Sequence, residues 1–341
     1  MPDTILPAET AEVGGYPIVD GRIHNSEGCE INAALHCNLR CRACSHLSPV
    51  MPAWLADPAR VARDLADLAE VYSCAYVRIL GGEPLLHTRL PEVIAAIRAS
   101  GITDRVTVCT NGLLLPSYDV RLWTLVDEIE ISVYPGAAPS DDELDAIRRR
   151  AQDHAVHLLV RLAPTFRESY SEQGTNDGQL IERIYRTCEI VHVWRCHTVH
   201  EGVVYRCPQS YFLHRPGAPG AHLPSDGLPI RRDEDFFAEL YAYLNSPHGP
   251  VACRWCLGTV GRSLEHKQMS RSRWHTAQDA PSEELVDLQL LADREHAVTA
   301  GPSGKVVLGD HEDTSPSWCG KTMLGDQEYA PPSWIRRRPM S

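Results

Sequence analysis

The sequence is poor in lysine and contains no long apolar run. Lysine and arginine together number 33, and only Lys267, Lys305 and Lys321 are lysines. No apolar stretch approaches the roughly 20 residues that a membrane-spanning helix needs. The opening MPDTILPAETAEVGG has acidic residues and prolines, but neither the basic nor the apolar region of a secretory signal. The lack of a long apolar run and of a secretory signal argues against a membrane or secreted protein. We therefore expect no membrane partner and a cytoplasmic location.

Basic charge is also lacking. The net charge is −12 and the sequence pI is about 5.7. Nucleic-acid-binding proteins concentrate lysine and arginine on one surface, and here only the terminal WIRRRPMS is basic, which is typical of a solvated chain end. We expect no nucleic-acid partner. A length of 341 residues with 43% apolar content is enough for one large domain and a smaller one.

Cysteine, by contrast, is plentiful. The chain has 12 cysteines, and clustered thiols in a reducing compartment indicate metal binding or catalysis rather than disulfides. The stretch LHCNLRCRACSHLSP spaces Cys37, Cys41 and Cys44 as C-x3-C-x2-C. Thiolates suit iron–sulfur clusters or zinc. Three of them leave one coordination position open, as catalytic metal sites do. A closed zinc site is the alternative, with His36 or His46 as the fourth ligand.

Strand and helix patterns alternate over about 130 residues. Strands are predicted at 31–36, 75–80, 106–110, 128–133 and 156–163, and helices at 58–71, 90–100, 117–126 and 141–154. This alternation predicts an α/β fold with right-handed βα units and a parallel sheet. Ligands bind at the carboxyl ends of such strands when the sheet forms a barrel or part of one.

Two further motifs follow strands of this predicted sheet. GGEP places Gly81, Gly82, Glu83 and Pro84 directly after the second strand. Glycines let a ligand or another backbone approach closely, and a carboxylate pairs with an ammonium group. CTNG places Asn111 at the end of the next strand.

Together these motifs resemble the radical S-adenosylmethionine (SAM) superfamily over about residues 30–165. The resemblance implies a partial (βα)6 TIM-like barrel, with a [4Fe-4S] cluster on the three cysteines and SAM on its open iron. It also implies cofactor-binding residues and one substrate contact. These are Gly81, Gly82, Glu83, Pro84, Asn111 and Ser132 for the cofactor, and Arg161 as a catalytic or substrate contact. One position departs from the family pattern, because Ala43 stands where an aromatic residue precedes the third cysteine.

A second group of cysteines follows the barrel pattern. Its members are Cys188, Cys196, Cys207, Cys253 and Cys256. VWRCHTVHEGVVYRCPQS predicts a β-hairpin around HEG, and the last two cysteines form a C-x2-C knuckle. The spacing resembles the twitch (SPASM-type) domains that carry one auxiliary [4Fe-4S] cluster. It leaves open whether Cys188 or Cys196 is the fourth ligand. Cys29, Cys74, Cys109 and Cys319 are interpreted as core or incidental thiols.

The predicted domain plan has four parts. They are an irregular segment at 1–29, a radical-SAM partial barrel at 30–186, a small twitch-like iron–sulfur domain at 187–265, and a C-terminal helix and tail at 266–341. Helices are predicted at 233–244 and at 282–294 within the last two parts.

The resemblance implies that the chain generates a 5′-deoxyadenosyl radical, which takes hydrogen from an unactivated C–H bond. An external donor of the flavodoxin or ferredoxin type supplies the electron. The layout resembles enzymes that tailor sugars, aminocyclitols and nucleosides in antibiotic biosynthesis, and cytosylglucuronate decarboxylases in particular. A uronate needs a cationic partner, for which Arg161, Arg167 and Arg195 are candidates, and Glu189 is a candidate acid–base group.

Three alternatives remain open at this point. One is dehydrogenation or epimerisation of an aminocyclitol or sugar, and another is modification of a peptide. The third, from a different class, is an iron–sulfur or zinc scaffold protein without catalysis.

Overall fold

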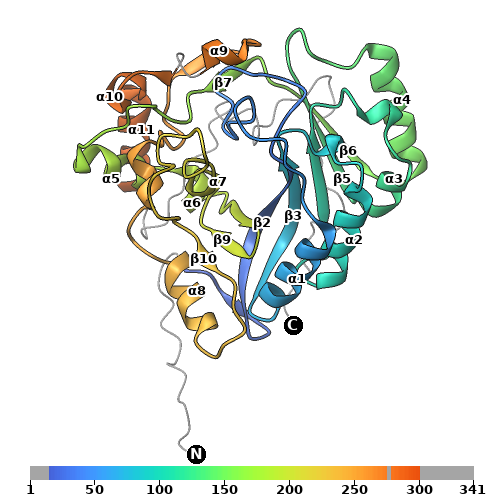
Figure 1. Ribbon diagram of the computed structural model, residues 1–341, viewed down its shortest axis with the longest axis horizontal. Helices are drawn as coiled ribbons and strands as arrows, with labels where there is room; N and C mark the ends of the chain where they lie inside the picture. Colours follow the sequence, from blue (N-terminus) through green and yellow to red (C-terminus); the bar gives the residue numbers. More distant parts are fainter. Residues whose placement is uncertain (1–14, 275–277, 300–341) are drawn as a thin grey trace, which may run out of the picture.

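A computed structural model describes residues 15–274 and 278–299 of the chain. Its centre is one large sheet with strand order β10-β9-β8-β2-β3-β4-β5-β6, and β1 pairs with β2 (Figure 1). The strands are β1 Ile18–Val19, β2 Arg22–Ala34, β3 Tyr72–Gly81, β4 Val106–Thr110, β5 Glu128–Val133, β6 His157–Leu162, β7 Thr165–Arg167, β8 His197–His200, β9 Val203–Tyr205, β10 Leu228–Pro229 and β11 Ser263–Glu265. The helices are α1 Pro58–Ala69, α2 Leu90–Ser100, α3 Arg121–Leu125, α4 Asp141–Asp153, α5 Gly178–Arg186, α6 Glu189–His192, α7 Pro208–Phe212, α8 Phe236–Leu244, α9 Arg271–Trp274, α10 Ser282–Leu285 and α11 Leu288–Thr299. Short 3-10 turns lie at η1 Pro84–Leu86, η2 Leu115–Ser117 and η3 Val251–Arg254.

The strands from β8 through β2 to β6 are parallel to their neighbours. Five of them follow the chain order that the sequence predicts, which confirms the α/β class and the partial barrel. The sixth parallel strand, β8, lies beside β2 rather than beyond β6. The predicted hairpin is also present, because β8 and β9 pair antiparallel. It extends the barrel's own sheet, although the sequence assigns it to the second domain.

The first long strand begins earlier than the sequence predicts. The segment 1–29 is expected to be irregular, yet β2 starts at Arg22. Polar residues hide this strand from a pattern search, because Asn25 and its neighbours are not apolar. In the structure Asn25 is buried, and its side-chain amide donates to the carbonyl oxygens of Gly28 and Arg195 and to the hydroxyl of Tyr72. A register shift between Asn25 and Gly28 accommodates this local irregularity.

Two predicted helices are shorter or divided. The helix expected at 117–126 is a 3-10 turn followed by the brief α3. The helix expected at 282–294 breaks into α10 and α11. There the Asp287 backbone N–H donates to Val260 O at 2.8 Å instead of continuing α10. Its carboxylate then accepts from Leu290 N at 3.0 Å and so starts α11.

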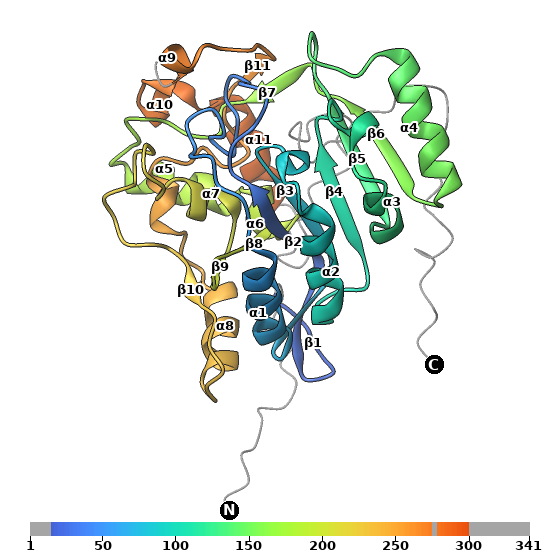
Figure 2. The same cartoon turned by 45° about the vertical axis from the view of Figure 1, so that its right-hand side comes forward.

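The outer face of the sheet is apolar and covered by helices. In Figures 1 and 2, α1 to α4 follow the outer side of β2 to β6. The sheet contributes alternate residues to this core, for example Ile31, Ile79, Val108 and Ile129, and α8 adds Leu240. The period of two puts the intervening residues of each strand on the inner face.

That inner face is polar. One row of register partners across the sheet consists of Thr198, Glu30, Arg78, Thr107, Glu128 and His157. In the next row Glu130 forms ion pairs with Arg161 at 3.1 Å and with Arg78 at 3.5 Å. Glu30 and Glu130 are almost completely buried. Barrel interiors are ordinarily filled by branched apolar side chains. The charged side chains of this interior instead favour contact with water or with a polar ligand.

In the part of the chain that the structure describes, no helix is long and apolar enough to cross a membrane. The end of the predicted C-terminal part, including Cys319 and the basic WIRRRPMS, lies outside the described residues.

The lowered pKa of Glu128 leads to a prediction of how acid changes the free energy of unfolding. Burial favours its neutral form, but hydrogen bonds and charges from His157 and Arg105 prevail and lower its pKa from 4.5 to about 2. Its ionised form therefore stabilises the fold fully above pH 4.5, and this contribution is lost as the pH falls toward 2. We expect Glu128→Gln to lower the free energy of unfolding by about 3 kcal/mol at neutral pH and by less than half of that near pH 3.

Urea unfolding of both proteins at the two pH values measures this difference. Glu265→Gln is the matched control, because its carboxylate is 83% exposed. A Glu128→Gln deficit that stays constant between the two pH values contradicts the prediction.

Candidate cofactor site

The loop after β2 brings the first three predicted cysteines together. Cys37, Cys41 and Cys44 line one cavity at the carboxyl end of the parallel strands. A distant segment holds the loop in place, since the Trp274 indole N–H donates to Cys41 O at 3.0 Å and the Gln268 amide contacts Cys41 Sγ at 3.4 Å. Burial raises the pKa of the Cys41 thiol to about 12. Thiols bind iron as thiolates, so metal binding supplies the charge that this buried site lacks.

Gly81 and Gly82 are required by the close approach of two backbones. A Cβ on Gly81 would lie 2.0 Å from Ala34 O, and a Cβ on Gly82 would lie 2.0 Å from His36 O. Gly82 N donates to Ala34 O at 2.8 Å, and Glu83 N donates to His36 O at 3.1 Å. The GGEP motif is thereby fixed against the start of the cysteine loop.

Glu83 is fully buried, and its carboxylate is well ordered by hydrogen bonds. It accepts from Thr110 Oγ1 at 2.6 Å, from Asn111 N at 2.9 Å and from Leu85 N at 3.0 Å, and the last of these caps η1. Burial raises the pKa of Glu83 to about 7, although these hydrogen bonds act in the opposite direction. A carboxylate has about four acceptor positions, so one remains for a further donor.

The other predicted cofactor residues surround the same cavity. Asn111 and Ser132 line it, and the Asn111 amide donates to Asn38 Oδ1 at 2.7 Å. Pro84 begins η1 directly behind Glu83. Arg161 is the register partner of Ser132 on the neighbouring strand β6, and its guanidinium pairs with Glu130. These side chains come from four different strands and converge at one end of the sheet.

Aromatic rings occupy the side of the cavity near Ala43. Ala43 is buried with positive φ of 55°, and it packs with Cys41 and Phe166. Tyr134 and Phe166 line the cavity with their rings stacked 5.5 Å apart. The ring of His266 stacks on Tyr134 at 4.9 Å. No local motif in the sequence marks these residues, because they come from separate segments of the chain.

Cys109 is a further cavity residue that the sequence analysis interprets as incidental. It lines the same cavity as the three loop cysteines, and its thiol lies 3.9 Å from Glu130 Oε2. The only signal for it is its place at the penultimate position of β4, just before the CTNG turn.

A second group of thiols gathers away from the first. Cys253 and Cys256 each lie close enough to Cys188 and Cys207 for their charges to interact, and all four are buried or nearly so. Burial raises the pKa of the Cys188 thiol to about 12, with the nearby Cys207 acting in the same direction. The donor set is therefore four thiols in an apolar setting, which fits an iron–sulfur cluster.

Cys196 lies directly before β8 and packs in the same buried cluster as Cys188 and Cys207, but it also contacts other groups. Its thiol lies 3.8 Å from Trp194 O, and its charge interacts with Tyr16. Arg195 stacks over the same Tyr16 ring, with 4.4 Å between the guanidinium carbon and the ring centre. Cys196 and Arg195 thus lie close to Tyr16, which lies just before the first strands of the sheet.

Two other predicted candidates, Glu189 and Arg167, are not among the residues that line the cavity. Glu189 pairs with Arg294 at 2.6 Å, and Arg167 donates to Gly261 O at 3.0 Å. Among the described residues, no three of histidine, cysteine, aspartate and glutamate are placed to hold a single metal ion.

Residues 31–160 match the family model described as the radical SAM superfamily. These residues form a radical SAM domain. Such domains hold a [4Fe-4S] cluster and SAM, so the first two predicted cofactors are confirmed at the level of the family. The three loop thiols suit an iron–sulfur cluster, and the ordered Glu83 carboxylate in the same cavity can accept from an ammonium group such as that of SAM.

Curated relatives share part of this sequence. The GTP 3′,8-cyclase of Chlorobaculum tepidum is 35% identical over 91 residues, which cover 27% of this chain and 26% of that protein. The probable GTP 3′,8-cyclase of Metallosphaera sedula is 29% identical over 121 residues, covering 35% of each chain. The chain thus spans about a quarter to a third of the length of these relatives.

Solved structures give more distant matches. BtrN in complex with AdoMet and 2-DOIA has a TM-score of 0.39 and 20% identity, with coverage of 65% of this chain and 88% of that one. Streptococcus suis SuiB bound to S-adenosylmethionine has a TM-score of 0.33 and 12% identity, with coverage of 66% and 69%.

The packing of Gly82 yields a prediction for the radical SAM domain. We expect Gly82→Ala to displace the cysteine loop, because the new methyl group would meet the backbone at His36 and Cys37. The anaerobically reconstituted variant should lose most of the iron bound by the first three cysteines, and its unfolding free energy should fall by about 2 kcal/mol or more.

Gly178→Ala is the control, since a Cβ there meets nothing within 4 Å. Iron analysis and urea unfolding measure both effects. If Gly82→Ala binds as much iron as Gly178→Ala, the proposed role of this backbone contact is wrong.

Proposed function

We propose that this chain is a radical SAM enzyme that abstracts hydrogen from a small sugar- or nucleoside-type intermediate in natural-product biosynthesis. The observation that carries the proposal is the convergence of Cys37, Cys41, Cys44 and Glu83 around one cavity at the carboxyl end of the sheet. When bound, the cluster and SAM supply a 5′-deoxyadenosyl radical.

The residues of the cavity have distinct parts in this proposal. The three thiols hold the cluster, and Glu83 uses its remaining acceptor position for the amino group of SAM, beside the backbone of Gly81 and Gly82. Asn111 and Ser132 contact the cofactor from the next strands. The stacked rings of the half-buried Tyr134 and the buried Phe166 shield the side of the cavity near Ala43 from water.

The polar inner face supports a polar substrate. Glu30, Arg78, Glu130 and Arg161 balance one another in charge and are largely or completely buried. A hydroxyl-rich molecule can replace the water that such groups prefer, whereas an apolar molecule cannot. Decarboxylation of a nucleoside uronate such as cytosylglucuronate is our specific hypothesis, with Arg161 as the partner of the carboxylate. Radical dehydrogenation of a sugar or aminocyclitol is the second candidate, since the same polar face accommodates its hydroxyl groups.

The second group of thiols is proposed to hold an auxiliary [4Fe-4S] cluster on Cys188, Cys207, Cys253 and Cys256. The mutual charge interactions of these four thiols support the choice of Cys188 over Cys196. An external donor of the flavodoxin or ferredoxin type supplies the electron for the first cluster.

The proposed function is tested by anaerobic reconstitution followed by reduction with SAM. We expect 5′-deoxyadenosine, and its yield should rise with the true substrate in a panel of uronates, aminocyclitols, GTP and peptides. With a uronate labelled in its carboxyl carbon, release of labelled CO2 supports decarboxylation. Retention of the label in an oxidised product supports dehydrogenation instead. Metal binding with no 5′-deoxyadenosine under any condition favours a scaffold protein.

The ligand choice gives a separate prediction. The wild type should bind about eight irons, and Cys188→Ala about four, because a cluster that loses one of its thiolates is held weakly. Cys196→Ala should retain about eight irons, since its thiol is not a ligand in this proposal. Iron analysis and the visible absorption of the two clusters check the prediction, and the reverse pattern would identify Cys196 as the ligand.

A further inference from the structure

The 3-10 turn that begins the Cys253–Cys256 segment has no capping side chain from its own N-terminal residue. The 3-10 turn η3 contains Cys253, and Cys256 lies two residues after its end. Pro250 precedes the turn and makes no side-chain hydrogen bond to it. Backbone N–H groups at the start of such a turn need acceptors from elsewhere.

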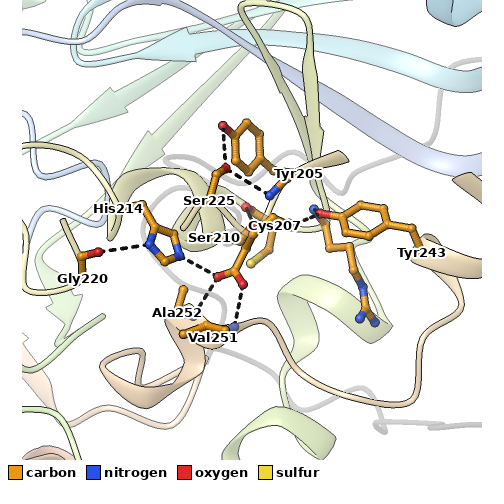
Figure 3. Close-up of polar contacts among 12 residues, drawn as sticks. Tyr205, Cys207, Ser210, His214, Gly220, Ser225, Tyr243, Val251 and Ala252 are labelled. Carbon is orange, nitrogen blue, oxygen red and sulfur yellow. Dashed lines mark hydrogen bonds and ion pairs between the residues drawn. The ribbon is translucent and has the colours of Figure 1, made fainter. Parts of the chain in front are cut away.

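Asp226 supplies these acceptors from 25 residues earlier in the chain. Its two carboxylate oxygens accept from Val251 N at 2.7 Å and from Ala252 N at 2.8 Å. A carboxylate that binds two consecutive backbone N–H groups fixes both the position and the direction of the turn. Figure 3 shows Val251 and Ala252 beside this carboxylate.

His214 holds the carboxylate in place. Its Nε2 lies 2.7 Å from Asp226 Oδ2, and its Nδ1 lies 3.1 Å from Gly220 O (Figure 3). Both neighbours are acceptors, so these contacts favour the protonated imidazole, in which both ring nitrogens donate. Burial favours the neutral ring, but the hydrogen bond and the charge of Asp226 prevail and raise the pKa of His214.

The backbone of Asp226 is tied to the other side of the thiol group. Tyr243 Oη donates to Asp226 O at 2.9 Å and accepts from Arg206 N at 3.1 Å. Arg206 directly precedes Cys207. One aspartate therefore connects the turn that leads into Cys253 and Cys256 to the backbone directly before Cys207.

We propose that Asp226 is a positioning residue that sets the spacing between Cys207 and the Cys253–Cys256 turn for the auxiliary cluster. The inference rests on the proposed auxiliary cluster. His214 acts through Asp226, and Tyr243 completes the connection to Cys207. Asp226 is well suited to this task because its side chain is only 8% exposed and its carboxylate accepts from backbone and side chain together.

The test uses the full-length chain reconstituted anaerobically, with Asp226→Asn as the main variant. Asparagine keeps the size of the side chain, but it turns an N–H donor toward a backbone N–H and loses the charge that pairs with His214. We expect its iron content to fall from about eight to about four, with loss of the electron paramagnetic resonance (EPR) signal of the auxiliary cluster only.

Two further variants make the test independent of folding. His214→Gln and Tyr243→Phe each remove one support of Asp226 and leave the carboxylate in place. We expect both to retain about eight irons and to shift the EPR signal or the midpoint potential of the auxiliary cluster alone. Ser140→Ala is the control, because it removes a comparable cap from the remote helix α4.

The outcomes separate the two proposals. A wild type with about four irons contradicts the auxiliary cluster itself. A wild type with about eight irons, together with an Asp226→Asn variant that matches it in iron content, EPR signal and potential, overturns the positioning role. If Asp226→Asn does not fold, unchanged auxiliary signals in both His214→Gln and Tyr243→Phe overturn it equally.

Discussion

The contact between the carboxyl ends of β2 and β3 is the constraint on which the cofactor site depends. The two backbones approach so closely that only glycine fits at Gly81 and Gly82. That approach places the GGEP motif directly against the first residues of the cysteine loop. Without it, the three thiols and Glu83 would belong to two unrelated loops. The absence of a Cβ atom at these two positions is therefore what allows the two segments to pack together.

Polarity is distributed over the sheet in an unusual way, and this gives the site its chemistry. The outer face packs against helices through alternate apolar residues, which supplies the stabilising burial. The inner face carries Glu30, Arg78, Glu130 and Arg161, and Glu130 forms ion pairs with both arginines. Burying such pairs adds little stability by itself, but they define the interior geometrically. Apolar packing on the outer face of the sheet therefore supplies most of the stability, and the inner face carries the polar side chains that can contact a ligand.

Much of the barrel could be predicted from the sequence, because local signals and tertiary packing agree there. The helix at 90–100 has apolar residues at helical spacing and ends at Gly101 in the left-handed region, and its predicted bounds match α2. The capping box of Ser140 and Glu143 likewise marks the start of α4. Motifs that are continuous in the chain, such as the cysteine loop and GGEP, were found for the same reason.

What was missed depends on contacts between distant segments. The early start of β2 rests on Asn25, whose partners Tyr72 and Arg195 lie far away in the sequence. The rings of Tyr134 and Phe166 meet only once the chain has folded. Asp226 is an ordinary aspartate within a Pro/Gly-rich loop, and nothing local shows that it caps a turn 25 residues later.

The pairing of β8 with β2 links the two groups of cysteines mechanically. Cys29 to Ile31 of β2 pair with His197 to Val199 of β8. The same β2 continues into the loop with Cys37, and β8 leads through the hairpin to Cys207. Cys37 and Cys207 are therefore each reached from one of two neighbouring, hydrogen-bonded strands. The ladder sets the distance between the segments that lead to Cys37 and to Cys207, and electron transfer to the proposed auxiliary cluster would cross that distance.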